Sequence, residues 1–264
     1  VWITNRNAST EDFRSIVALA DLGESDEEYL VNPNSVNATN PPSVTGGNLP
    51  TNNSNNLGDL LTENSGLRNI STIRETLPGS FQEGTDYSVL ENARKLEPNE
   101  YTLNSQLGFI SLNRRLIDGD VLAVAYEYTV AGNVMGTAEK SFRVGEFSND
   151  GVQAPNNLAV KLLRSEILQT KKKENGVTIE EAFPTWRLMM KNIYALGAFP
   201  LSQDGFRFEV QYRDDQTGIA SNVLQRAESN SISTTPLLQV LNLDQLDQTQ
   251  FRDPDGFFDY VEGV

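Results

Sequence analysis

The sequence predicts an α+β fold that is predominantly β: antiparallel, sandwich-like sheets with one or two packed helices and a long disordered-type loop. Three observations predict it. Segments between residues 86 and 147 alternate bulky with small or polar residues at a period of two, which is typical of half-buried strands. Residues 183–197 place apolar side chains at helical spacing. Residues 32–57 form a low-complexity tract of Asn, Pro, Ser, Thr and Gly.

The N-terminal part predicts two strands followed by the loop. "VWITN" (1–5) reads as a short strand. "RSIVALADLGE" (14–24) is compatible with helix or strand, because periodicity does not separate them over this length. The β-compatible Ile16 and Val17 and the abrupt Leu-Gly-Glu stop favour strand. We expect residues 32–57 to be a mobile surface loop, because little in them is apolar enough to offset the cost of ordering.

The middle of the chain predicts an antiparallel sandwich-like unit. In residues 120–130 the bulky side chains lie on one face and smaller or polar ones on the other, and residues 131–133 favour a hairpin turn. Several short strands at this spacing are typical of such a unit. The other predicted strands of this part are 86–90, 100–104, 107–112 and 141–147.

The clearest helix signal covers residues 183–197. Pro184 suits a first turn and Gly197 a C-terminal cap, and the apolar side chains in between share one face that we expect to pack on a sheet. These side chains are Trp186, Met189, Met190, Ile193 and Tyr194.

The flanking C-terminal segments give mixed signals. Residues 156–168 are ambiguous, and residues 169–177, with Lys171, Lys172 and Lys173, predict a solvated connector. Residues 206–214 alternate cleanly and predict a strand, and residues 235–246 predict a short helix.

The predicted organisation is one composite domain in four parts. Residues 1–31 hold N-terminal strands, 32–66 the Asn/Pro/Ser-rich loop, 67–155 the sandwich-like unit, and 156–264 a helix-plus-strand unit packing on it. The chain starts at Val1 and shows no signal-peptide pattern, so we expect a fragment of a longer protein. No apolar run is long enough to form a membrane-spanning helix.

Composition excludes several functional classes. A net charge of -15 and a pI of about 4.4 disfavour nucleic acid and anionic lipid as partners. The absence of Cys and His removes disulfides, thiolate nucleophiles, Ser-His-Asp chemistry and most transition-metal sites. No nucleotide-binding glycine motif occurs. We therefore predict no enzyme, no catalytic residue and no cofactor, and keep a carboxylate hydrolase only as a third hypothesis.

One stretch has the spacing of a metal loop. "FRDPDGFFDYVEGV" (251–264) places Asp253, Asp255 and Asp259 around Gly256, which suggests calcium ligands. The register of an EF-hand is not kept, and Pro254 suits a tight Asp-Pro-Asp-Gly turn. The turn is the favoured interpretation, and the three Asp remain candidate metal ligands.

Several blocks, taken together, resemble one family. They run in order over almost the whole chain, except the Asn-rich tract and the Lys connector, and are specific only as a set. The blocks are "VWITNR", "IVALADLGE", "ENARKLEPNEYTLNSQLGFISLN" (91–113), "VLAVAYEYTVAGNV" (121–134), "RVGEFSNDGV" (143–152), "LAVKLLRS" (158–165), "PTWRLMMKNIYALGA" (184–198) and "LDQ…DPDGFFDYVEG" (243–263). The set resembles the SprA (Sov) family, giant outer-membrane proteins of type IX secretion and gliding motility in Bacteroidetes.

The resemblance implies a piece of a protein-conducting translocon. In that family the full protein forms an outer-membrane barrel that passes folded cargo bearing a C-terminal signal domain, and partner proteins gate the pore. This fragment would not itself span the membrane and would face the periplasm or the cell surface. The resemblance carries over no catalytic residue, and it implies that residues 253–259 form a corner leading to further strands.

Two functional hypotheses follow. The first is a non-enzymatic translocon domain that serves as scaffold or contacts secreted cargo and other type IX secretion components. The alternative is a surface adhesin or glycan-binding β-sandwich module with a calcium site. Under either hypothesis Tyr101, Tyr126 and Tyr128 are read as sandwich core in preference to barrel-facing aromatics.

Overall fold

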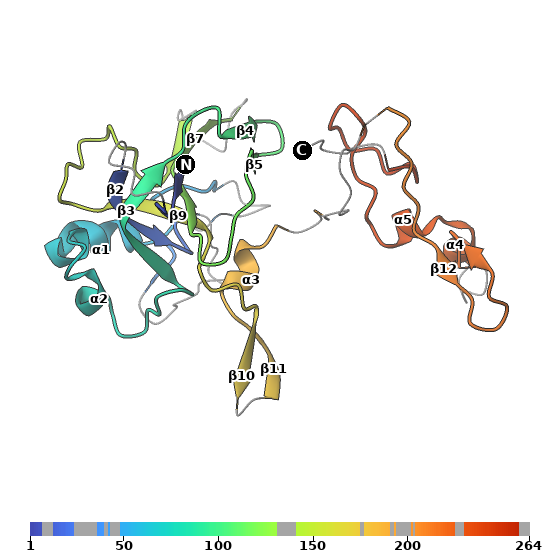
Figure 1. Ribbon diagram of the computed structural model, residues 1–264, viewed down its shortest axis with the longest axis horizontal. Coiled ribbons are helices and arrows are strands. Elements are labelled where there is room, and N and C mark those ends of the chain that lie inside the picture. Colours follow the sequence, from blue (N-terminus) through green and yellow to red (C-terminus); the bar gives the residue numbers. More distant parts are fainter. Residues whose placement is uncertain are drawn as a thin grey trace. The chain divides into compact units, whose positions relative to one another are not determined.

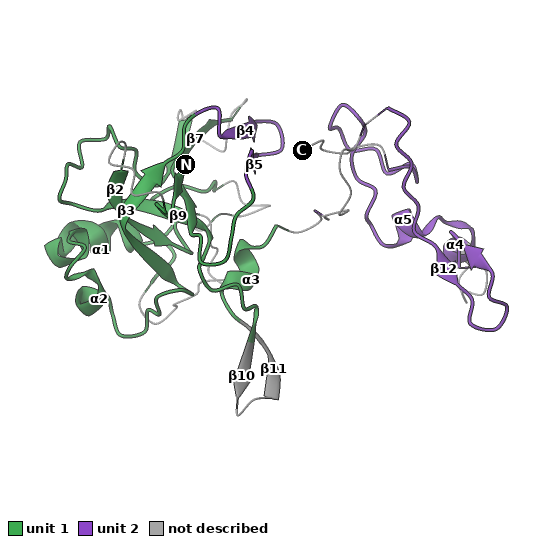
Figure 2. Cartoon of the chain, in the orientation of Figure 1, with its two compact units in different colours: residues 1–97, 115–190 green, residues 98–114, 191–264 purple. Residues whose placement is uncertain are grey.

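The computed structural model divides the chain into two compact units (Figure 2). Unit 1 contains residues 1–97 and 115–190, and unit 2 contains residues 98–114 and 191–264. For residues 172–174, 177–182 and 230 the structure describes the backbone alone. The described residues are 1–6, 13–23, 36–39, 42, 48–130, 141–174, 177–190, 193, 202, 204–224 and 230–258.

Unit 1 contains most of the regular structure (Figure 1). Its strands are β1 (Trp2–Ile3), β2 (Phe13–Leu19), β3 (Tyr87–Lys95), β6 (Leu122–Val124), β7 (Tyr126–Thr129), β8 (Ser141–Val144), β9 (Leu158–Arg164), β10 (Lys171–Glu174) and β11 (Val177–Ala182). Its helical segments are α1 (Leu57–Glu63), the 3-10 turn η2 (Ser65–Arg68), α2 (Ile73–Thr76) and α3 (Thr185–Leu188).

The described residues of unit 2 form short elements only. They are β4 (Tyr101–Asn104), β5 (Phe109–Leu112), β12 (Tyr212–Arg213), β13 (Ala220–Ser221), α4 (Asn230–Thr234) and α5 (Leu237–Val240). β4 pairs with β5 and β12 with β13, each as an antiparallel two-stranded sheet.

The central sheet of unit 1 closes on itself. Its strand order is β1-β3-β2-β9-β6, and β1 pairs with β6 to complete the ring. The β2–β9 pair is parallel, with Ile16 opposite Leu158 and Leu19 opposite Lys161, and the other four pairs are antiparallel. The sequence-predicted fold class, α+β and predominantly β with antiparallel sheets, is confirmed.

Both faces of this sheet are buried. One apolar cluster lies on the inner face, and a second lies on the outer face beneath the helical segments 57–76. Alternate residues of β2 separate the two clusters: Ile16 and Ala18 join the inner one, and Val17 and Leu19 the outer one. A strand buried on both sides reads as a continuous apolar run, which explains why periodicity did not identify β2.

The helical segments cover the outer face through few side chains. Leu57 and Leu61 of α1, Leu67 of η2 and Ile73 of α2 are at most 5% exposed and pack with Tyr87 of β3. Burying each such side chain stabilises the fold by about 1.5–3 kcal/mol. Segments of four to seven residues would not be stable alone, so this packing holds them in place.

The strand predicted over residues 120–130 is divided in two. β6 joins the closed sheet, whereas β7 leaves it after Ala125 and pairs with β8. Gly145 faces this junction: a Cβ atom there would lie 3.0 Å from the Ala125 Cβ. The ambiguous segment 156–168 is resolved as strand β9.

The long helix predicted over residues 183–197 is wrong in its described part. α3 ends at Leu188, and Met189 is already extended with φ -69° and ψ 133°. Trp186, Met189 and Met190 are 45%, 48% and 56% exposed, whereas Leu188 packs against the inner cluster. An amphipathic pattern gives a helix only where its apolar face is buried. Residues 194–197 lie outside the described residues.

Other C-terminal predictions are shortened or changed. The strand predicted over 206–214 pairs only at Tyr212–Arg213, and the helix predicted over 235–246 is α5 alone. The Lys connector is not a simple turn, because its residues Lys171–Glu174 form β10, which pairs with β11. The boundary expected between residues 155 and 156 falls inside unit 1, because β9 belongs to the closed sheet.

The described part of the Asn-rich tract is ordered, contrary to the expected mobile loop. Val36, Ser54 and Asn55 are 1%, 0% and 3% exposed. The Asn55 Nδ2 donates to the Asp21 carbonyl (3.0 Å), and its Oδ1 accepts from the Leu57 amide (3.0 Å). Short polar side chains here satisfy buried backbone groups in place of a strand partner.

Replacing Asn55 with Ala tests this assignment. Because two buried backbone groups would lose their partners, we expect the free energy of unfolding to fall by about 2 kcal/mol or more, measured by urea denaturation. Asn53→Ala, at an exposed neighbouring position, is the control and should change it by less than about 0.5 kcal/mol. Equal effects of the two substitutions would contradict a structural role for Asn55.

Candidate functional site

The main candidate site is a cleft of unit 1 with a volume of about 440 Å³. The turn at residues 51–55 and helix α1 contribute most of its lining residues. Three buried apolar side chains, Leu22, Leu61 and Ala159, also line it, beside the Arg68–Glu146 pair. A mixed apolar and polar lining is typical of a small-ligand binding cleft.

A bidentate ion pair lies in the cleft. Arg68 donates from Nη1 to Glu146 Oε2 and from Nη2 to Glu146 Oε1, both at 2.7 Å. Each side chain is only 20% exposed. Arg68 Nη1 also donates to the Asn157 carbonyl (3.3 Å), and Glu146 Oε2 accepts from the Ala159 amide (2.8 Å).

This network joins η2 to β9 and to the segment that follows β8. Both carboxylate oxygens of Glu146 accept hydrogen bonds, so the pair is arranged to hold structure or contact a ligand. The amides of the cleft are also engaged: Asn52 accepts from the Gly145 amide (2.7 Å) and donates to the Gly145 carbonyl (3.3 Å). The arrangement therefore offers hydrogen bonding and apolar contact, and a second carboxylate, the exposed Asp59 of α1, also lines the cleft.

Glu146→Gln should destabilise unit 1 by about 2–4 kcal/mol, because it leaves the half-buried Arg68 charge without its counter-ion. The matched control is Glu83→Gln. The Arg74–Glu83 pair is also bidentate, with nitrogen–oxygen distances of 2.7 and 2.9 Å, but its side chains are 45% and 31% exposed. That control should cost less than about 1 kcal/mol. Urea unfolding of both variants measures the difference, and similar losses would show that burial of the pair does not matter.

Two of the three candidate metal ligands, Asp253 and Asp255, lie on a hydrogen-bonded bend of unit 2. Asp255 Oδ1 accepts from the Phe257 amide (2.9 Å), and the Asp253 amide donates to the Gln245 carbonyl (3.1 Å). Gly256 has φ +97°, a conformation that favours glycine. Asp259 lies outside the described residues. Across the described part of the chain, no three Asp, Glu, His or Cys side chains gather closely enough to hold a metal ion.

Two upstream acids hold this bend in shape. Asp244 is 1% exposed, and its Oδ2 accepts from the Gly256 amide (2.7 Å). Asp247 Oδ1 accepts from the amides of Thr249 (2.7 Å) and Phe251 (3.0 Å). These bonds, with the Thr249 hydroxyl first, lower the pKa of Asp247 below its ordinary value. The Asp-x-Thr pattern at Asp247–Thr249 is a local sequence signal of such a turn, whereas no local pattern marks Asp244 as the residue that holds the Gly256 amide.

The three Tyr residues singled out by the sequence have different surroundings. The Tyr128 ring stacks on Phe142 at 5.5 Å between centroids, and its hydroxyl donates to the Pro50 carbonyl (2.8 Å). Burial raises the pKa of Tyr128. Tyr126 packs against the outer cluster of unit 1, and Tyr101 belongs to β4 of unit 2.

Comparison with known proteins identifies no relative. No protein-family model matches the chain, and none of the curated proteins matches it. Among the described helices, none combines the length and the apolar character needed to cross a membrane.

Proposed function

We propose that the chain is a non-enzymatic domain of a large outer-membrane translocon for type IX secretion and gliding motility. It serves as a scaffold that contacts secreted cargo or other components of the secretion system, and it lies on the periplasmic side or at the cell surface. The observation that carries the proposal is the ordered set of sequence blocks resembling the SprA (Sov) family, which runs over almost the whole chain.

The contrast between the two units supports a role within a larger assembly. Unit 1 has two apolar clusters, whereas the only buried residues among those described in unit 2 are Leu237, Leu238 and Asp244. Large apolar side chains of unit 2 are instead exposed: Leu103, Ile193, Tyr212, Ile219, Ile232, Val240, Leu241, Phe251 and Phe257. Apolar surface of this kind is typical of segments that other polypeptides cover.

The chemistry of the cleft also favours a scaffold over a catalyst. Of the two carboxylates that line it, Glu146 is tied to Arg68 and to a backbone amide, so it supplies structural contacts, and Asp59 is exposed on α1. The net charge of -15 argues for protein partners over nucleic acid.

Deleting residues 1–264 of this sequence from the full-length protein tests the proposal. In cells that naturally make it, we expect cargo bearing the C-terminal signal domain to disappear from the medium and surface spreading to stop. Immunoblots of medium and membrane fractions measure secretion and the level of the shortened protein. The control is Glu83→Gln, a substitution in unit 1 at a side chain that is 31% exposed, and cells with this variant should secrete cargo normally. Normal secretion by a stable deletion variant would refute the proposal.

The alternative, a surface adhesin or glycan-binding module with a calcium site, is favoured by one observation. Asp253 and Asp255 are exposed on the same bend, on either side of Pro254. The alternative requires millimolar calcium to raise the melting temperature and Asp255→Ala to abolish the rise.

The translocon proposal instead expects a melting temperature that calcium leaves unchanged, measured by calorimetry with and without chelator. Asp59→Ala, an exposed acid on α1 of unit 1, is the control for a general effect of removing a negative charge. A calcium shift lost only in Asp255→Ala would favour the alternative.

A further inference from the structure

We propose that residues 251–257 of unit 2 form a rigid docking epitope for a protein surface that carries an apolar pocket rimmed by Lys or Arg side chains. We call these residues the Phe-Asp bend. The inference goes beyond the proposed function and does not depend on it, since it rests on the described residues of the bend alone.

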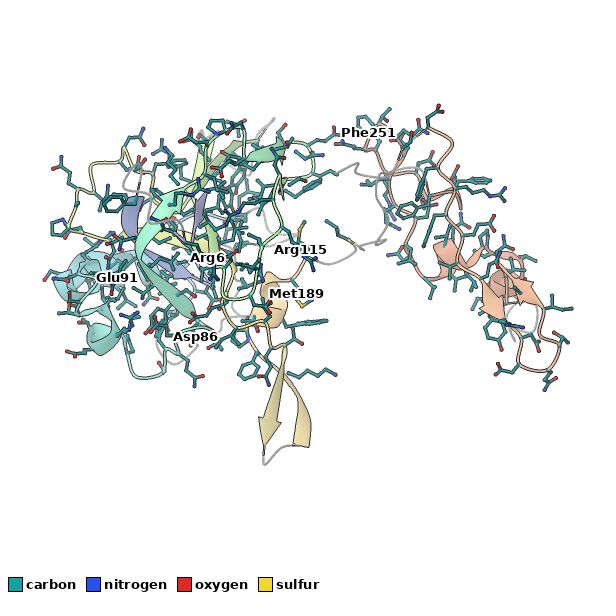
Figure 3. The ribbon with its side chains drawn as sticks, viewed as in Figure 1. Arg6, Asp86, Glu91, Arg115, Met189 and Phe251 are labelled. Atoms are coloured by element: carbon teal, nitrogen blue, oxygen red, sulfur yellow. The ribbon has the colours of Figure 1, made fainter. Side chains whose placement is uncertain are left out.

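The first observation is the exposure of two aromatic rings. Phe251 and Phe257 are 67% and 65% exposed, and Figure 3 shows Phe251 on an outer loop of unit 2. The adjacent Phe258 behaves differently, because its ring lies 6.3 Å from that of Phe206 and 5.4 Å from that of Phe208, measured between centroids. Phe258 therefore contacts the aromatic cluster of Phe206 and Phe208, whereas the rings of Phe251 and Phe257 stay exposed to solvent. Exposed aromatic rings are frequent anchors of protein interfaces.

The second observation is that the backbone of the bend is held by side chains from outside it. Asp247 accepts from the Phe251 amide (3.0 Å), and the buried Asp244 accepts from the Gly256 amide (2.7 Å). Gln239 Nε2 donates to the Pro254 carbonyl (2.6 Å). A backbone that is ordered beforehand loses little entropy on binding, so the contact energy of the two rings is retained as affinity.

The third observation is the charge between the rings. Between Phe251 and Phe257 stand two Asp and one Arg, Asp253, Asp255 and Arg252, a net charge of -1 by difference. Asp253 and Asp255 are exposed, next to the exposed rings. A complementary surface therefore carries positive charge around the pockets that receive the rings. A second copy docking through the same bend would bring like charges together, which argues for a different, basic partner.

A photo-crosslinking amino acid, benzoyl-phenylalanine, placed at position 257 of the full-length protein tests this in the cells that make it. The matched control is the same amino acid at position 219, because Ile219 is also in unit 2 and is 65% exposed. We expect a discrete adduct at position 257 that is absent at position 219. Mass spectrometry of the adduct should place the cross-link in a partner peptide with apolar residues flanked by Lys or Arg.

Substitutions that change the charge at position 253 give a second test of the docking epitope. Asp253→Lys should lower the adduct yield about threefold or more, and Asp253→Glu should keep it, because attraction between opposite charges accelerates docking. Circular dichroism and equal protein levels check that both variants fold. Equal adducts at positions 257 and 219, or a yield unaffected by Asp253→Lys, would overturn the proposal. An adduct with a second copy of this chain would also overturn it.

Discussion

The closure of the central sheet by β1 is the constraint on which the rest of unit 1 depends. This strand has only two residues, yet it pairs with β3 on one side and with β6 on the other. The residues that follow it reinforce the closure: the Thr4 amide donates to the Val121 carbonyl (3.2 Å), and Arg6 Nε donates to the Asp120 carboxylate (2.7 Å). Asp120 is 1% exposed, so this ion pair is shielded from solvent on the acid's side. Closure removes the open edges at which another chain could pair.

Closure also separates the two cores and so positions the candidate cleft. The inner cluster fills the ring, and the outer face of β2, β3 and β9 becomes the floor on which the helical segments lie. The Arg68–Glu146 pair and the Asn52–Gly145 pair then connect the helical and Asn-rich segments to the strands. The cleft lies where these polar connections cross apolar residues such as Leu61 and Ala159. The shape of the cleft therefore follows from the hydrogen bonds that hold the helical and Asn-rich segments against the closed sheet.

Local pattern predicted the strands but not their assembly. Strands were predicted at 86–90, 100–104, 107–112, 120–130 and 141–147, and each of these ranges contains strand. However, β3 extends to Lys95, and the strand predicted over 120–130 is divided into β6 and β7. The ring itself was not predicted, because a two-residue strand such as β1 has no period. The helix at 183–197 failed because its apolar face stays exposed, and the Asn-rich tract was misread because composition does not reveal that Asn55 binds buried backbone. Of the candidate site, the bend at 253–256 was predicted, whereas the Arg68–Glu146 pair joins residues 78 positions apart and has no local signal.

The parallel pairing of β2 with β9 has a consequence for how the chain acquires its structure. Ile16 lies opposite Leu158, so the inner strands meet only after more than half of the chain is available. A ribosome or an export channel that releases the chain from its N-terminus exposes the apolar run of β2 long before β9, the second of its two partner strands, emerges. Such distant pairings slow folding and leave aggregation-prone segments uncovered in the meantime. A chain of this topology therefore gains from a holding factor that shields residues 16–19 until residues 158–164 arrive.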